Sequence, residues 1–198
     1  MKHSVQNHAK RTGASLVAAV GIAMFGIGSA QADPTFTTAN ITVNSVGFLE
    51  CAFKEAGLPP GAPVDYSCGA TDVGWVTQCF IKSKPVSNIP PKLHVAHNSD
   101  GLTTIQDRTA SNRGTVTSSI LTAYPTVEEE VGPPLCPETE GITITEEVTA
   151  IRWCNTTLTD VTNNVPGASE AELFQQLNRK GSSDIPGCDV LPTLPTDI

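Results

Sequence analysis

The chain of 198 residues is poor in charge, because only 16% of its residues are Asp, Glu, Lys or Arg. Such a low charged fraction argues against a coiled coil, a long exposed helix and a highly charged disordered chain. Positive charge is the scarcer sign: 12 Lys and Arg residues stand against 20 Asp and Glu residues, for a formal net charge of -8. An acidic protein has no general attraction for nucleic acid or anionic lipid. We therefore expect no nucleic-acid partner.

Several motifs of known chemistry are also missing. None of the cysteines lies in a Cys-x-x-Cys pair, so a zinc ribbon or a thioredoxin-like site has little support. There is no Gly-x-Ser-x-Gly elbow for a hydrolase nucleophile and no EF-hand spacing for calcium. Aromatic residues make up only 5% of the chain, which leaves few sugar platforms for a glycosidase. We expect a non-enzymatic protein without cofactor or metal.

Residues 1–32 have the pattern of a secretory signal peptide. Three basic residues and no acid precede the apolar run Leu16–Ile27, which is shorter than the roughly 20 residues of a membrane-spanning helix. The small-x-small triplet Ala30-Gln31-Ala32 then predicts cleavage before Asp33. The alternative is an uncleaved N-terminal membrane anchor. No later apolar run is long enough to span a membrane, so we expect a secreted, extracellular monomer without membrane contact.

The cysteines indicate a disulfide framework, because an even number in an exported chain favours bridges over metal or catalysis. All six lie in the mature part: Cys51, Cys68, Cys79, Cys136, Cys154 and Cys188. Cys51 and Cys68 are nearly equidistant from the turn sequence Pro59-Pro60-Gly61, so a hairpin would place them opposite each other. The remaining pairs follow by elimination: Cys79 with Cys136 and Cys154 with Cys188. A hairpin around Gly74 that pairs Cys68 with Cys79 is the competing arrangement.

Short runs of β-branched and alternating residues fill the body of the chain. In Phe48–Phe53 every second residue, beginning at Leu49, is apolar, and the same period recurs over Val64–Cys68. Further strands are predicted over 37–46, 73–81, 93–96, 115–123 and 142–161, the last as one long strand or two successive ones. No helix-length pattern separates these strands, which favours antiparallel hairpins. Residues 33–165 are therefore predicted to form an all-β, immunoglobulin-like antiparallel β-sandwich.

The last part of the chain, residues 166–198, carries a different signal. Ser169-Glu170-Ala171-Glu172 matches a capping box, in which the first serine and the last glutamate satisfy the free amides of a helix N-terminus. Leu173 and Leu177 would then share one helical face. We expect a short helix over Glu170–Lys180, followed by a Pro-rich tail.

Part of the chain, from Ile41 to Asn164, also resembles a known group. Its order of motifs is similar to that of small secreted β-sandwich proteins from actinobacteria and fungi. The matching motifs are Cys51–Leu58, Val64–Tyr66, Cys79, Cys136-Pro137 and Leu158–Asn163. The resemblance implies a secreted β-sandwich and no functional residue. Cys68, Cys154 and Cys188 are additions to the pattern.

The candidate chemistries are few. His94 and His97 are the only histidines of the mature chain; on a helix they would form a metal pair, whereas on a strand they would point to opposite faces. Either histidine would also have to supply the base of a Ser-His-Asp triad. Trp75 and Trp153 could mark a binding surface, but we expect tryptophans to lie in the core of a sandwich.

The loops carry weaker signals. Glu128–Glu130 is interpreted as a solvated charged loop, and Asp100-Gly101 and Asp107 as turn residues in preference to calcium ligands. Two sequences, Asn40-Ile41-Thr42 and Asn155-Thr156-Thr157, match the N-glycosylation sequon, which matters only in a eukaryotic host.

These observations favour a secreted, non-catalytic module that binds an extracellular protein or surface through its loops. One alternative is a secreted hydrolase with a site assembled from dispersed residues. A cleft that brings His94 or His97 within hydrogen-bond reach of Ser and Asp would favour it, whereas an exposed apolar patch would favour the module. The other alternative is a protease inhibitor that inserts the loop Lys82–Pro91 into a protease cleft.

Overall fold

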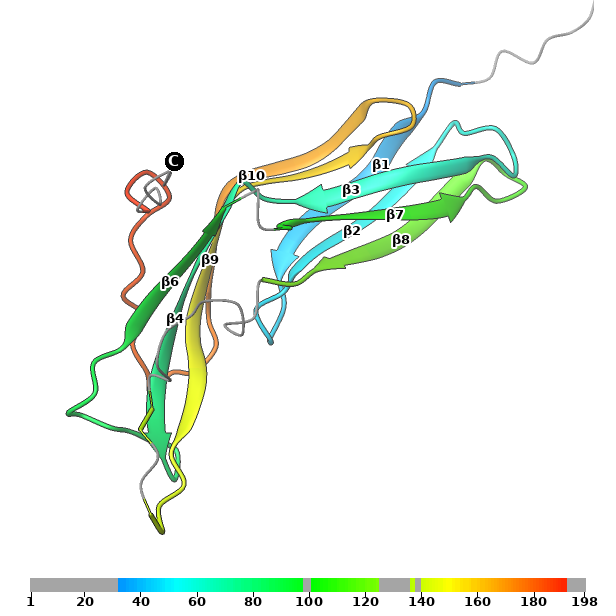
Figure 1. Cartoon of the computed structure of the whole chain (residues 1–198). Helices are drawn as coiled ribbons and strands as arrows, with labels where there is room; N and C mark the ends of the chain where they lie inside the picture. The colour runs from blue at the N-terminus through cyan, green and yellow to red at the C-terminus, as the bar shows by residue number, and fades with distance from the viewer. Residues whose placement is uncertain (1–31, 98–100, 125–135, 138–139, 192–198) are drawn as a thin grey trace, which may run out of the picture. The chain divides into compact units, whose positions relative to one another are not determined.

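The computed structural model describes residues 32–97, 101–124, 136–137 and 140–191 (Figure 1). Within these ranges the regular structure consists of ten β-strands and no helix. They are β1 (Thr35–Val43), β2 (Leu49–Ala56), β3 (Pro63–Gly69), β4 (Asp72–Ile81), β5 (Lys84–Pro85), β6 (Lys92–His97), β7 (Thr103–Thr109), β8 (Thr115–Thr122), β9 (Thr145–Asp160) and β10 (Val165–Gln176). The predicted signal peptide, apart from Ala32, lies outside the described residues.

The strands form two antiparallel sheets that pack together, as the alternating sequence pattern predicted. A three-stranded sheet has the order β1-β2-β8, and a larger sheet has the order β5-β4-β9-β3-β7, with β10 beside β9 and β6 beside β4. Every strand pair is antiparallel. We use the name sandwich for one part of the molecule. It consists of β1, β2, β3, β7 and β8, together with the C-terminal end of β9 and the N-terminal end of β10, which pair with each other. It is closed at its sides, because β1 contacts β10 and β7 contacts β8.

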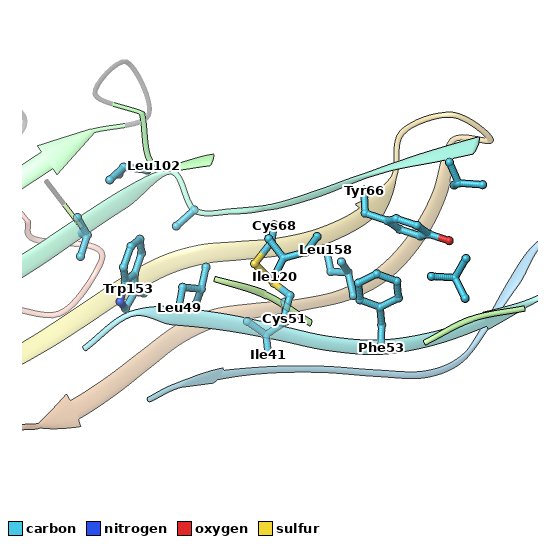
Figure 2. Packing of buried hydrophobic residues seen from close by; sticks show 14 of the residues in the cluster. Ile41, Leu49, Cys51, Phe53, Tyr66, Cys68, Leu102, Ile120, Trp153 and Leu158 are labelled. Atoms are coloured by element: carbon cyan, nitrogen blue, oxygen red, sulfur yellow. A yellow bond between two sulfur atoms is a disulfide. The ribbon is translucent and has the colours of Figure 1, made fainter. Parts of the chain in front are cut away.

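The sandwich interior is built from the inward positions of a period-two pattern. Leu49, Cys51 and Phe53 of β2 are almost completely buried, as are the alternate residues of β3 that face them. Figure 2 shows the Cys51–Cys68 disulfide lying among these side chains, with Phe53 beside Tyr66. Their ring centroids are 4.4 Å apart. The buried face predicted for β2 is confirmed.

Strand β9 connects the sandwich to a second part of the same sheet. This strand is a single run of 16 residues, so the first of the two sequence alternatives is correct. Its last four residues pair with β3, whereas Thr145–Cys154 pair with β4. We call β4, β5, β6 and Thr145–Cys154 of β9 the extension. The change of partner falls at Asn155, whose φ of 50° is in the left-handed region that asparagine tolerates.

The predicted helix over Glu170–Lys180 is wrong. Strand β10 runs through the capping-box sequence and pairs with β9 from Val165 opposite Asp160 to Gln176 opposite Ala150. A short isolated helix is marginal in water, and β9 offers a long row of backbone partners that the helix would not use. Glu172, the glutamate of the expected capping box, instead forms an ion pair with Arg152 of β9.

Three disulfides hold the described residues together. They are the predicted pairs Cys51–Cys68, Cys79–Cys136 and Cys154–Cys188. The hairpin expected around Pro59-Pro60-Gly61 is wrong, because β2 and β3 lie in different sheets and Cys51–Cys68 joins the two layers. Bridges of this number are typical of proteins that fold in an oxidising, extracellular environment. In the described part of the chain, no helix has the length and apolar character to cross a membrane.

Candidate functional site

The two candidate histidines lie on β6 and have separate partners. His94 is buried and stacks on Trp75 of β4, with ring centroids 5.3 Å apart and an interplanar angle of 10°. Its Nε2 lies 2.9 Å from the Thr77 hydroxyl. His97 is half-buried, and its Nδ1 lies 2.5 Å from a carboxylate oxygen of Asp72. The strand places them on opposite faces, as the alternation of side chains requires.

The residues around His97 are arranged in an order that differs from a catalytic triad. The Thr71 hydroxyl donates to Asp72 Oδ2 at 2.5 Å, so the carboxylate lies between the hydroxyl and the imidazole. In a triad the imidazole lies between them and removes the hydroxyl proton. The Asn155 amide also donates to Thr71 Oγ1 at 3.0 Å. The cluster links the start of β4 to β6 and to the point where β9 changes partner.

No group of three or more His, Cys, Asp or Glu side chains that could hold a metal ion occurs within the described ranges. Asp107 is exposed on β7, whereas Asp100 lies outside those ranges.

Both tryptophans are core residues, as expected for a sandwich. Trp75 is 4% exposed and Trp153 is fully buried. The Trp153 indole Nε1–H donates to the Gly47 carbonyl at 3.0 Å. Neither ring contributes to an exposed surface that could stack a ligand.

A buried polar cluster lies inside the sandwich, where two carboxyl side chains meet a tyrosine. Glu55 of β2 and Asp160 of β9 are both fully buried. The Tyr66 hydroxyl of β3 donates to Glu55 Oε2 at 2.6 Å. Asp160 accepts from the backbone N–H and the side-chain amide of Asn163, at 2.9 and 2.7 Å. Two adjacent acids are therefore enclosed between the sheets.

Burial inside the sandwich changes the pKa values of Glu55 and Tyr66. The pKa of Glu55 is raised from its ordinary value of 4.5 to about 7. Burial is the largest cause, the hydrogen bond from Tyr66 opposes the rise, and the neighbouring Asp160 contributes to it. Burial and the two carboxyl groups also raise the pKa of Tyr66. Glu55 therefore carries a proton in the folded protein at mildly acidic pH, and near neutral pH it is partly ionised.

A loop-lined hollow lies at the end of the extension, away from these clusters. It has a volume of about 740 Å³. Its lining comes from the end of β4 and from the segment that enters β9: Ile81, Lys82, Ser83, Gly141, Ile142, Thr143, Thr145 and Glu147. Ile142 is 47% exposed, so an apolar side chain is presented among polar neighbours. The hollow thus combines an apolar contact with one cationic and one anionic side chain.

The walls of the hollow are held by local structure on both sides. Lys82 and Ser83 both have positive φ, at 50° and 63°, which is the two-residue hairpin turn that matches the twist of paired strands. The Cys79–Cys136 bridge joins the chain just before each wall. Glu147 Oε2 accepts from the Asn178 amide at 2.9 Å. These contacts restrict the movement of the lining residues.

The sequence also singled out the loop of residues 82–91, two glycosylation sequons and an acidic run. Residues 82–91 are largely exposed, and the Val86 N–H of this segment donates to the Cys79 carbonyl at 2.9 Å. Both sequon asparagines, Asn40 and Asn155, are exposed. The acidic run Glu128–Glu130 lies outside the described residues.

Two features went unrecognised in the sequence. Glu55 continues the buried series Leu49, Cys51 and Phe53 at the same period, so the inward position of this acid was readable. The hollow had no comparable signal, because its walls are about 60 residues apart in sequence and meet only when β4 pairs with β9.

Comparison of the chain with protein-family models, curated proteins and solved structures found no match.

Proposed function

We propose that this protein is an exported, non-catalytic binding module whose hollow at the end of the extension takes an extended segment of a partner protein. The observation that carries the proposal is the half-exposed Ile142 side chain in a hollow of about 740 Å³. Binding sites commonly combine apolar contact area with a few polar groups that fix orientation. Lys82 and Glu147 supply such groups with opposite charge.

The partner segment is defined by this chemistry. An apolar side chain of the segment would contact Ile142 and Ile81, and flanking polar or charged groups would reach Lys82 and Glu147. The site is small compared with the interface of a stable protein complex, which supports a short peptide segment as the occupant. Loops on a rigid scaffold are the usual place for such recognition.

The scaffold is consistent with an exported, immunoglobulin-like module. Two antiparallel sheets enclose the Cys51–Cys68 bridge, with a buried tryptophan, Trp153, in the same hydrophobic cluster. An inter-sheet disulfide packed with a tryptophan is a feature of immunoglobulin domains. The predicted signal peptide and the three bridges support export.

Selection from a peptide library displayed on phage tests this function. The mature protein is the bait, and the affinity of enriched peptides is then measured for the protein and two variants. Ile142→Asp should weaken binding about tenfold or more, because a charge replaces the apolar contact. Ile105→Asp is the matched control, since Ile105 is 62% exposed on β7 and does not line the hollow. Failure to enrich any peptide, or equal binding by both variants, would contradict the proposal.

Protease inhibition is the second candidate, favoured by the exposed segment of residues 82–91 that is pinned at Cys79. A rigid, exposed loop is what a protease cleft accepts from an inhibitor. Titration of common serine proteases with the mature protein measures this directly. Full residual protease activity at equimolar and higher ratios would contradict inhibition and would leave the peptide-binding proposal unaffected.

A further inference from the structure

The chain after β10 forms a cover over one face of the extension (Figure 1, orange to red). We call this segment, Asn178–Leu191, the strap; it contains no β-strand or helix. Its side chains Ile185 and Leu191 are 5% and 9% exposed and pack in one cluster with Val76 and Ala150. Without the strap, this apolar face of β4 and β9 would be open to water.

Glycine stands at the points where the strap and the extension approach most closely. A Cβ added to Gly74 of β4 would lie 3.0 Å from Leu191 Cδ2 and 3.3 Å from Ile185 Cγ2. A Cβ added to Gly181 would lie 2.2 Å from Thr149 Cγ2. Glycine inside a strand often marks a place where another part of the chain comes close. The extension therefore has a seat whose shape fits the strap.

Polar side chains of the extension bind the strap backbone and fix its path. The Thr149 hydroxyl donates to the Ser182 carbonyl at 2.6 Å, and the Ser182 N–H donates to Gln78 Oε1 at 3.0 Å. Arg152 Nη2 donates to the Ile185 carbonyl at 3.2 Å. These side chains lie on β4 and β9. The Asn178 N–H at the start of the strap also donates to the Thr149 carbonyl at 3.0 Å, but the strap continues without strand pairing.

The Cys154–Cys188 disulfide is the covalent tether of the strap to the extension. Ordering an irregular segment of this length costs backbone entropy at every residue, and two buried apolar side chains return little of it. The tether keeps the segment close to its seat and lowers that cost. The two cysteines differ in burial, because Cys154 is fully buried whereas Cys188 is partly buried.

We propose that the strap is thiol-releasable, so that reduction of Cys154–Cys188 uncovers the apolar face of the extension while the sandwich stays folded. A reductant thiolate attacks the sulfur of Cys188, the less buried of the two cysteines, forms a mixed disulfide and expels Cys154 as a thiolate, which takes up a proton. A second thiol of the reductant then attacks the mixed disulfide and frees the Cys188 thiol. The reductant leaves as a disulfide after giving two electrons. Release of the strap requires no occupant in the binding hollow, although Asn178 of the strap bonds Glu147 in its wall.

The first test is graded reduction of the mature protein in glutathione redox buffers, with alkylation and peptide mass spectrometry. Cys154–Cys188 should open under less reducing conditions than Cys51–Cys68, whose two cysteines are both fully buried inside the sandwich. Opening of Cys51–Cys68 first, or of both bridges together, would overturn the proposal.

The second test separates the strap from the rest of the chain. The double variant Cys154→Ser/Cys188→Ser removes the tether, and hydrogen exchange is compared with the oxidised protein. We expect exchange about 100-fold faster in the strap, with β2 and β3 unchanged, and increased binding of an apolar fluorescent dye. Unchanged strap protection would overturn the proposal, and so would loss of protection in β2 and β3.

A third measurement applies even if the double variant fails to fold. Ile185→Asp/Leu191→Asp keeps the disulfide but places charges in the apolar seat. We expect increased dye binding and faster exchange in the strap, with Val190→Asp, at a position 61% exposed, as the matched control. Equal exchange and dye binding in the two proteins would show that the strap is not seated on this face.

Discussion

The sandwich and the extension cover their interiors in different ways. In the sandwich, each layer is a β-sheet, and the Cys51–Cys68 bridge joins two strands inside the core. In the extension, one face of β4 and β9 is covered by the irregular strap, and Cys154–Cys188 joins that cover to a strand. Paired strands satisfy their own backbone groups, whereas an irregular cover depends on side chains and a covalent tether.

Because the two regions are covered differently, their disulfides, Cys51–Cys68 and Cys154–Cys188, have different effects on stability. A bridge inside a two-layer core restricts the unfolded chain and stabilises the whole domain. A bridge that fastens a cover stabilises the protein by no more than the docking free energy of that cover, because the cover can leave while the rest stays folded.

The largest effect is expected at the residue that joins the two regions. Trp153 is fully buried on β9, and its indole bonds the Gly47 carbonyl. Trp153→Ala should lower the free energy of unfolding by about 3–5 kcal/mol, as measured by urea denaturation. Ile105→Ala, at a position 62% exposed, should change it by less than about 0.5 kcal/mol. A loss below 1 kcal/mol for Trp153→Ala would contradict the role of this residue.

The bridges should differ in their effect on global stability. Removing Cys51–Cys68, which closes a sequence separation of 17 residues, by Cys51→Ala/Cys68→Ala should cost about 3 kcal/mol. Cys154→Ser/Cys188→Ser should cost less than half of that, although its sequence separation is 34 residues. Denaturant titrations of both variants give the comparison. Losses that increase with loop length would mean that both bridges act only on the unfolded chain.

The sandwich should also lose stability as the pH rises. Because the pKa of Glu55 is raised from 4.5 to about 7 on folding, the folded state binds more protons than the unfolded state between these values. The stabilisation is complete below pH 4.5 and is lost as the pH rises through 7, by up to about 3 kcal/mol.

The groups that face Glu55 are Tyr66 and Asp160, and neither is a cation that would favour its ionised form. Glu55→Gln keeps an oxygen that can accept from Tyr66 but cannot ionise. Thermal unfolding from pH 4 to pH 8 should therefore show a flatter pH dependence for Glu55→Gln than for the unmodified protein. An identical pH dependence would rule out Glu55 as its source.

The smallest global effect is expected in the strap. Ile41 of β1 and Ile185 of the strap are equally buried, at 4% and 5% exposure. Ile41→Ala should cost about 2–5 kcal/mol, whereas Ile185→Ala should cost less than about 1 kcal/mol of global stability. Denaturant titration of the two variants measures their free energies of unfolding. Because the two side chains are equally buried, a difference between the losses comes from the region in which each residue lies. Equal losses would show that the strap unfolds together with the sandwich.

Much of the fold was predictable because it depends on a local pattern. The alternation in β2 and β3 identified their buried faces, and Cys51 and Cys68 lie on those faces. The two strands do not form the expected hairpin, because they belong to different sheets, and the bridge joins the two layers. The error at Glu170–Lys180 arose where a local capping signal competed with pairing to the distant strand β9. Capping acts within one turn of chain, whereas the pairing that determines β10 is set by tertiary contacts.

The candidate sites were less predictable for the same reason. The hollow and the seat of the strap are formed by side chains that meet only after β4 and β9 pair. Gly74 looked like the centre of a possible hairpin, yet it lies inside β4, where its missing side chain leaves room for Leu191. A glycine in a strand has several uses, and the sequence does not distinguish among them.

The central claim is that the protein is exported and that three specific bridges hold its sandwich and extension. The most direct test is peptide mass spectrometry of the exported protein under non-reducing conditions. We predict a mature N-terminus at Asp33 and the links Cys51–Cys68, Cys79–Cys136 and Cys154–Cys188. A Cys68–Cys79 link, or six free thiols in a chain that still begins at Met1, would contradict it.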